Sequence, residues 1–147
     1  MSYSFAGNQL HEIDLKRGDH YRNPYPEGFT PVNVPEGASG DWKVVRFTTT
    51  EDSVGLYNLR LIRDGQWRRI LPPGTYTKLV HSSEGVVMSD TPAEAHEHRS
   101  LYVNARGSVL LNGLGLGFAL SAILRKPEVE HVTVVERSTD VIRLASS

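Results

Sequence analysis

The chain has 147 residues, which is enough for an ordinary globular core. Its formal net charge is −1, so the composition does not indicate a basic surface for binding nucleic acid. It contains no cysteine, so disulfides, thiolate zinc sites and a cysteine nucleophile are excluded. The N-terminal segment lacks a signal-peptide pattern, and no apolar run approaches the length of a membrane-spanning helix, so we expect a cytoplasmic protein without membrane contact.

Residues 1–40 are expected to form an extended or looping arm. The stretch RNPYPEGFTPVNVPEGASGD contains four prolines and three glycines, a composition that disfavours regular structure. The aromatic residues Tyr21, Tyr25 and Phe29 suggest that the arm is pinned onto the body of the protein or onto a neighbouring subunit. A partly ordered leader is the alternative interpretation.

Residues 41–90 are expected to form a small antiparallel β region. The stretch WKVVRFTTT is β-branched and alternating, and two further short strands are expected at 75–81 and 85–89. Between the WKVVRFTTT stretch and the strand expected at 75–81, Asp64-Gly65 separates two alternating runs, which predicts a type I′ hairpin turn. The residues of this hairpin expected to share a buried face are Leu59, Leu61, Trp67 and Ile70.

The pattern changes to that of a helix at Thr91. Thr91, Pro92 and Glu94 form a capping-box sequence with proline at the first helical position. The helix should run to about residues 102–104, with Gly107 as a left-handed stop. Asp90, just before it, is more plausibly an alternative cap than a catalytic group.

The His-Glu-His sequence on this helix is expected to lie on a solvated face. His96 and His98 are two residues apart and therefore point in different directions, so no metal site is expected. Glu94 and His98 are four residues apart, which favours a simple pair between them.

Residues 108–147 are expected to form a β-α-β-α unit. SVLLNG and EHVTVVE are apolar runs of strand length, which is typical of parallel strands buried on both faces. The helix GFALSAILRK lies between them and ends before Pro127, and a last helix begins with Ser138 or Thr139 as its N-cap. The predicted fold class is therefore α+β, with the capped helix and a truncated Rossmann-like unit occupying residues 91–147.

Gly113, Gly115 and Gly117 lie where the first of these strands turns into a helix. Glycine permits a sharp turn there and lets a ligand approach the backbone. Glu136 ends the second strand, where a carboxylate can accept hydrogen bonds from both ribose hydroxyls of an adenosine. The spacing G-x-G-x-G, with Phe118 in place of a third fingerprint glycine, disfavours NAD, and no P-loop lysine follows.

This arrangement resembles motif I of the class I S-adenosylmethionine-dependent methyltransferases, and most of all their spermidine synthase-like branch. The resemblance covers residues 85–144 and implies a bound S-adenosylmethionine or its decarboxylated form, with methyl or aminopropyl transfer as the activity. It implies that Glu136 binds the ribose and that Arg137 or Ser138 lies beside the adenine. The residues implied to line the methionine and adenosine moieties are Asn112, Gly113, Leu114, Gly115 and Gly117.

The resemblance further implies that the helix beginning near Thr91 lies at the substrate mouth. Its candidates for ligand contacts are Glu94, Glu97 and Tyr102. No catalytic general base is identified.

Departures from the family pattern support a second hypothesis. Leu111 and Leu116 occupy positions where many relatives carry an acid, and the chain supplies only the first two strands of the family's sheet. Two such strands cannot close a core alone. Either the N-terminal β region packs against them, or another subunit covers them, or the chain is a piece of a longer protein, and we therefore also expect a homo-oligomer. The alternative function is a non-catalytic, truncated remnant that acts as an oligomeric structural or interaction module.

Overall fold

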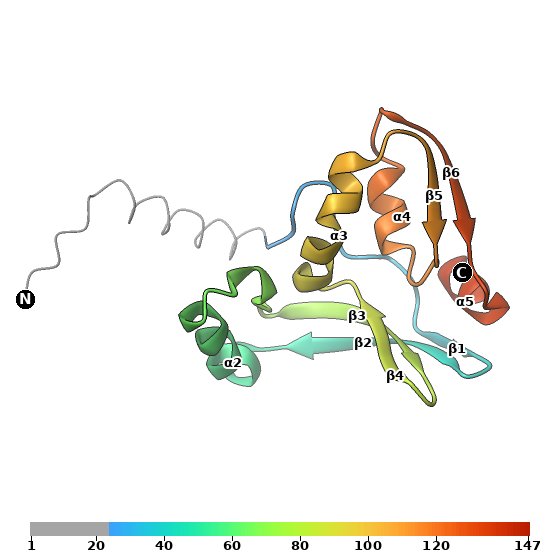
Figure 1. Ribbon diagram of the computed structural model, residues 1–147. Helices are drawn as coiled ribbons and strands as arrows, with labels where there is room; N and C mark the ends of the chain where they lie inside the picture. The colour runs from blue at the N-terminus through green and yellow to red at the C-terminus, as the bar shows by residue number, and fades with distance from the viewer. Residues whose placement is uncertain (1–23) are drawn as a thin grey trace, which may run out of the picture.

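The computed structural model describes residues 24–147 and shows a mixed α+β fold with two separate sheets (Figure 1). The antiparallel sheet contains β1 (Gly37–Ser39), β2 (Trp42–Thr49), β3 (Gly74–His81) and β4 (Gly85–Ser89). The parallel sheet contains β5 (Gly107–Asn112) and β6 (Val129–Val135). The helices are α2 (Glu51–Arg63), the short 3-10 helix η1 (Trp67–Arg69), α3 (Pro92–Asn104), α4 (Phe118–Ile123) and α5 (Thr139–Ala145).

The antiparallel sheet follows the chain order β1-β2-β3-β4. The strands expected at 75–81 and 85–89, and the alternating run that follows Asp41, are all confirmed. β1 lies within the segment expected to be an irregular arm, and it pairs antiparallel with β2, with Gly37 opposite Val44. The prediction of an arm through residue 40 is therefore wrong at its C-terminal end.

The predicted hairpin around Asp64-Gly65 is wrong, because the residues before this turn form helix α2. Thr50 caps the helix: its hydroxyl accepts a hydrogen bond from the Ser53 N–H at 3.3 Å, and the Ser53 hydroxyl accepts one from the Thr50 N–H at 2.8 Å. Glu51 and Asp52 in the first turn complement the positive end of the helix dipole.

The burial pattern of α2 is helical. Val54, Asn58 and Leu61 are buried at a spacing of four and three residues, whereas Leu59 is 64% exposed. Trp67 begins η1 instead of a second strand, so of the four residues expected to share a buried face only Leu61 and Ile70 are buried. Gly65 does adopt a left-handed conformation, with φ of 72°, just after the helix ends.

The irregular segment before β1 is fixed onto the body by its aromatic side chains. Phe29 is buried, with its ring centroid 5.2 Å from that of Phe118 and 5.8 Å from that of Tyr102. Tyr25 also contacts the Phe118 ring, edge-on. Pinning onto the body is therefore confirmed for Tyr25 and Phe29, while Tyr21 lies outside the described residues.

Asp90 holds this segment to the sheet and does not cap a helix. Its buried carboxylate accepts hydrogen bonds from the N–H groups of Thr77, at 2.6 Å, and Val32, at 3.0 Å. The Tyr25 hydroxyl donates to the Asp90 carbonyl oxygen at 2.7 Å. Burial raises the pKa of Asp90 above its ordinary value, against the opposing effect of these N–H donors.

Helix α3 begins and ends as expected, with Thr91 as the N-cap. Only half of the capping box forms, because the Glu94 carboxylate accepts from the Ser89 N–H at 3.3 Å. The helix closes at Ala105, and Gly107, with φ of 58°, starts β5. Gly107 is therefore not the helix stop that the sequence predicted.

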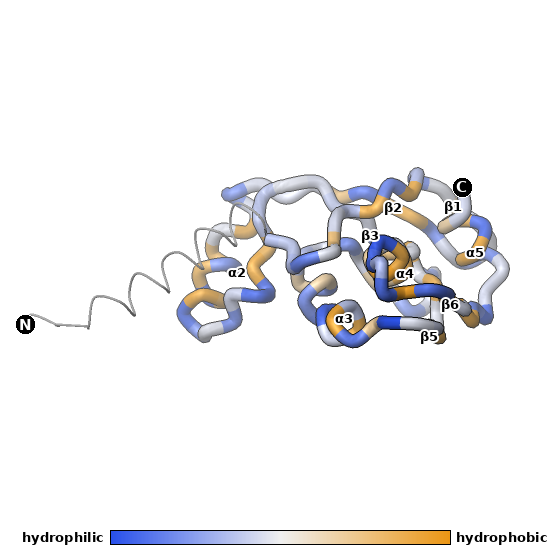
Figure 2. The backbone as a smooth tube through the Cα atoms, turned by 90° about the horizontal axis from the view of Figure 1, so that it is seen from above, coloured by the Kyte–Doolittle hydropathy of each residue, from blue (hydrophilic) through white to orange (hydrophobic). Residues whose placement is uncertain are grey.

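The β5–β6 sheet is covered on one face only, which corrects the expectation of burial on both faces. Residues of α3 and α4 pack with Leu111, Val132 and Val134 on the covered face. On the other face Leu110 is 61% exposed and Val135 is 56% exposed. Figure 2 shows this pair of strands at the opposite end of the molecule from α2.

Helix α5 begins at the expected N-cap, since the Ser138 hydroxyl accepts a hydrogen bond from the Val141 N–H at 3.3 Å. It packs on β1 and β2, where the Ser39 hydroxyl donates to the Asp140 carboxylate at 2.6 Å. The two sheets are thus joined through α5 and a shared apolar cluster that includes Val44, Leu79 and Leu116. In the part of the chain from residue 24 onward, no helix has the length and apolar character needed to cross a membrane.

Candidate functional site

The turn between β5 and α4 depends on three glycines in left-handed conformations. The φ angles are 95° at Gly113, 54° at Gly115 and 72° at Gly117, a region that residues with a side chain rarely adopt. The Gly113 N–H donates to the Val135 carbonyl at 2.7 Å, which ties the start of the turn to the end of β6. The turn is therefore a defined backbone structure, and it places its amides next to the C-terminal end of β6.

Gly115 lies directly against a side chain from the other sheet. A Cβ atom at this position would overlap the sulfur of Met88, far inside van der Waals contact. The same sulfur accepts a hydrogen bond from the Leu116 N–H at 3.1 Å. β4 therefore supports the glycine turn directly, a contact that no local sequence pattern reveals.

Glu136 reaches back to the glycine turn from the end of β6. One carboxylate oxygen accepts a hydrogen bond from the Leu114 N–H at 2.8 Å, and the other accepts from the Ser138 N–H at 2.9 Å. Burial alone would raise the pKa of Glu136, but hydrogen bonds from backbone N–H groups outweigh it and lower the pKa below its ordinary value. The side chain is therefore an anion and a pure hydrogen-bond acceptor at neutral pH.

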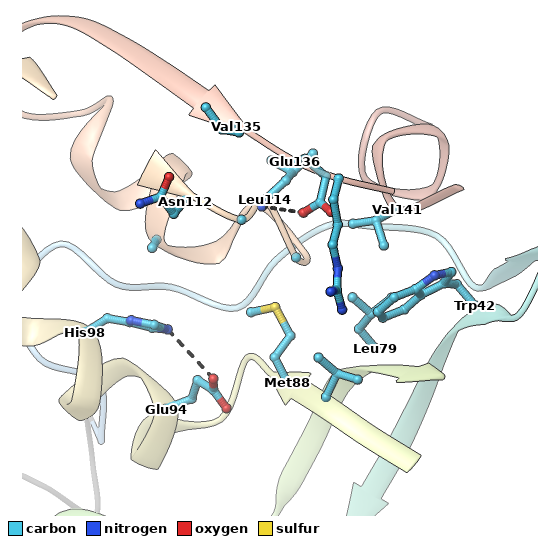
Figure 3. A pocket seen from close by; sticks show the side chains of 15 residues that line it. Trp42, Leu79, Met88, Glu94, His98, Asn112, Leu114, Val135, Glu136 and Val141 are labelled. Atoms are coloured by element: carbon cyan, nitrogen blue, oxygen red, sulfur yellow. Dashed lines mark hydrogen bonds and ion pairs between the residues drawn. The ribbon is translucent and has the colours of Figure 1, made fainter. Parts of the chain in front are cut away.

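A cavity of about 530 Å³ opens between the glycine turn and the antiparallel sheet (Figure 3). Its volume is in the range of small-molecule sites. Of the glycine-turn residues expected to contact the ligand, Gly117 does not line it and instead lines a second cavity of about 400 Å³. The predicted residues that do line it are Asn112, Gly113, Leu114, Gly115, Glu136 and Arg137.

The antiparallel sheet and helices α3, α4 and α5 supply the other walls, and of their residues only Glu94 was a candidate from the sequence. Trp42 comes from β2, Leu79 from β3, and Val87 and Met88 from β4. These residues lie far from the glycine turn in sequence, so only the packing of the two sheets brings them to it. The further lining residues from helices and from β6 are Glu94, His98, Ala119, Val135 and Val141.

The candidate contacts on α3 are separated by the structure. Glu94 lines the cavity and pairs with His98, with 3.7 Å between a carboxylate oxygen and the imidazole Nε2, as the four-residue spacing predicted. Glu97 is exposed outside the cavity, and Tyr102 packs against Phe29. Among these candidates, only Glu94 is in place to touch a ligand.

His96 is not on a solvated face, contrary to expectation. It is half-buried, with its ring centroid 5.9 Å from that of Trp67, and burial lowers its pKa. His98 projects into the cavity on a different side of the helix, as the two-residue spacing requires. Among residues 24–147, no three His, Asp or Glu side chains gather closely enough to hold a metal ion.

Comparisons with known proteins identified no relative of this chain. No protein-family model, no curated protein and no solved structure matches the chain.

Proposed function

We propose that the cavity binds a nucleoside-containing ligand of the S-adenosylmethionine type, and that β5, α4, β6 and α5 act as a small Rossmann-like unit. The observation that carries the proposal is the position of Glu136. Its carboxylate lines the cavity beside the glycine turn and is held there by the Leu114 and Ser138 amides. A carboxylate at this position favours a ribose diol over a phosphate, because it accepts hydrogen bonds and repels anions.

Backbone donors orient the Glu136 carboxylate. One oxygen accepts from the Leu114 amide and the other from the Ser138 amide, and the amides of Gly115 and Arg137 also help to lower the pKa of the side chain. A carboxylate offers about four lone-pair sites, so a ribose diol would share these oxygens with the backbone amides.

Transfer of a methyl or aminopropyl group is the activity that fits such a ligand. The nucleophile attacks the carbon next to the sulfonium, that carbon–sulfur bond breaks, and the sulfur leaves as a neutral thioether. Because the sulfonium is already a good leaving group, the protein contributes mainly by holding the two reactants in line. We assign no general base to this step.

Isothermal titration calorimetry with S-adenosylmethionine tests the proposal. Glu136→Gln should weaken binding by about tenfold or more, since it removes charged hydrogen bonds that are each worth about 1.5–3 kcal/mol. Glu130→Gln, on the exposed side of the same strand, is the matched control and should bind like the wild type. Saturable binding that is equal in all three proteins, or that NAD displaces, would contradict the proposal.

The open face of β5–β6 favours the second candidate function, an oligomeric interaction module. Leu110 and Val135 are exposed there, and neither strand pairs with any other strand of the described chain. Covering such a face with a second copy removes apolar surface from water. The cytoplasmic location expected from the sequence remains a prediction.

Light scattering coupled to size-exclusion chromatography tests the homo-oligomer. We expect a wild-type dimer that Leu110→Glu converts to a monomer. Leu56→Glu is the control, because Leu56 on α2 is 66% exposed and lies away from this face. A wild-type protein that stays monomeric at high concentration would contradict the oligomer while leaving ligand binding open to its own test.

A further inference from the structure

The walls of the large cavity differ in chemistry from one end to the other. In Figure 3, Trp42, Leu79 and Val141 lie together at one end, and Glu94 and His98 lie at the opposite end. Glu136 lies above the space between these two groups (Figure 3). A ligand with its ribose at Glu136 therefore has an apolar, aromatic end of the cavity on one side and a charged end on the other.

The indole of Trp42 is held in position by its surroundings. Its ring centroid is 4.7 Å from that of His81, in an edge-on arrangement, and the two residues face each other across β2 and β3. Trp42 also packs against the apolar cluster that contains Leu79 and Val141. A ring fixed in this way loses little conformational entropy when a flat ligand stacks on it.

We propose that Trp42 is the platform on which the adenine ring of the ligand stacks. This inference rests on the proposed function, and it adds a base-binding residue that comes from the antiparallel sheet and not from the glycine unit. Purine rings are flat and polarisable, so the aromatic end suits the base, and stacking on an indole is the strongest contact available there.

The opposite end of the cavity suits the other half of the ligand. The Glu94 carboxylate is an acceptor for an ammonium group, as carried by a methionine or aminopropyl tail.

Ser138, one of the two residues expected beside the adenine, uses its hydroxyl to cap α5 and is not among the cavity-lining residues. Arg137, the other residue expected beside the adenine, does line the cavity and remains a candidate for that contact.

The chain contains two tryptophans, which makes a direct optical test possible. Trp67 lies in η1, outside the cavity, so a Trp67→Phe variant leaves Trp42 as the only tryptophan reporter. We expect S-adenosylmethionine and adenosine to quench its fluorescence saturably, with excitation at the red edge where adenine does not absorb. Methionine alone, which has no base to stack, should leave the fluorescence unchanged.

Calorimetry on matched variants measures the contribution to affinity. Trp42→Ala should weaken S-adenosylmethionine binding about fivefold to a hundredfold, the range expected for loss of one base–aromatic stack. Trp42→Phe keeps an aromatic ring and should lose much less, and Trp67→Ala should not change the affinity. If Trp42→Ala does not fold, the fluorescence of Trp67→Phe and the affinity of Trp42→Phe still decide the question.

The outcomes separate the two proposals. Calorimetric binding of S-adenosylmethionine without quenching of Trp42, and with unchanged affinity in Trp42→Ala, would overturn the platform and leave the proposed function standing. A folded wild-type protein that shows no calorimetric binding would overturn the proposed function, and the platform with it. Quenching of Trp67→Phe by both adenosine and S-adenosylmethionine, absent in Trp42→Phe, where Trp67 is the only tryptophan, is the expected result.

Discussion

Substitution of Gly115 by alanine should cost much more stability than the same substitution at Gly117. Both glycines belong to one turn and have left-handed φ angles of 54° and 72°, so alanine at either position costs about 1–2 kcal/mol of backbone strain. At Gly117 a new Cβ has no neighbour within 4 Å, whereas at Gly115 it overlaps the sulfur of Met88. Overpacking of this kind adds about 1–3 kcal/mol.

The total for Gly115→Ala is therefore about 2–5 kcal/mol, against about 1–2 kcal/mol for Gly117→Ala. Urea unfolding followed by tryptophan fluorescence measures the difference, and 2 kcal/mol corresponds to a midpoint lower by about 1 M. In a Met88→Ala background the excess cost of Gly115→Ala should disappear, because the clashing sulfur is gone. Equal costs at the two glycines, or an excess that Met88→Ala does not relieve, would refute the proposed support of the turn by β4.

Two further predictions concern buried polar groups. Asp90→Ala should lower the free energy of unfolding by about 2–5 kcal/mol, since it leaves the buried amides of Val32 and Thr77 without their acceptor. Because burial raises the pKa of Asp90, its own contribution to stability is fully present below the ordinary aspartate pKa and is lost as pH rises through the raised value. The difference in unfolding free energy between wild type and Asp90→Ala, measured against pH, should show this loss, and a difference independent of pH would contradict it. Asn58→Ala should cost about 1–3 kcal/mol in a thermal melt, because Asn58 makes two hydrogen bonds to the Leu71 backbone, at 2.8 and 3.0 Å, and an unchanged midpoint would contradict this role.

Features set by neighbouring residues could be predicted from the sequence. The β-branched run after Asp41, the proline-capped start of α3 and the N-cap of α5 depend on contacts within a few residues, and all three are confirmed. The glycine turn and its partner Glu136 also follow from a local β-α-β order. Most of the predicted site residues consequently line one cavity.

Helix α2 shows how a short apolar alternation misleads. Leu59 and Leu61 alternate with polar residues, which suits a strand. An alternation over only four residues, 58–61, is too short to distinguish the two-residue period of a strand from the 3.6-residue period of a helix. The better signals were the cap at Thr50, the acidic first turn that follows it, and the helical spacing of Val54, Asn58 and Leu61. Asp64-Gly65 marks a turn in both interpretations, so it could not decide between them.

Contacts between distant elements could not be predicted from local patterns. The apolar runs of β5 and β6 indicate strands, but whether the second face is covered depends on what else packs there, and Leu110 and Val135 are exposed. In the same way, Trp42 and Met88 reach the glycine turn only because the antiparallel sheet packs against it. The sequence therefore identified the wall of the candidate site formed by the glycine turn and Glu136, and missed the wall formed by the antiparallel sheet.

The most direct test of the account follows the backbone amides of the ¹⁵N-labelled protein by NMR during titration with S-adenosylmethionine. The account predicts saturable shifts of the Gly113, Leu114 and Gly115 amides together with the Trp42 indole N–H, while the Gly65 amide, far from the cavity, stays unchanged. The same titration of Glu136→Gln should require a much higher ligand concentration. Absence of shifts at the glycine turn of the folded wild-type protein, or shifts confined to residues outside the cavity, would contradict the claim that this turn and Glu136 form a nucleoside-binding site.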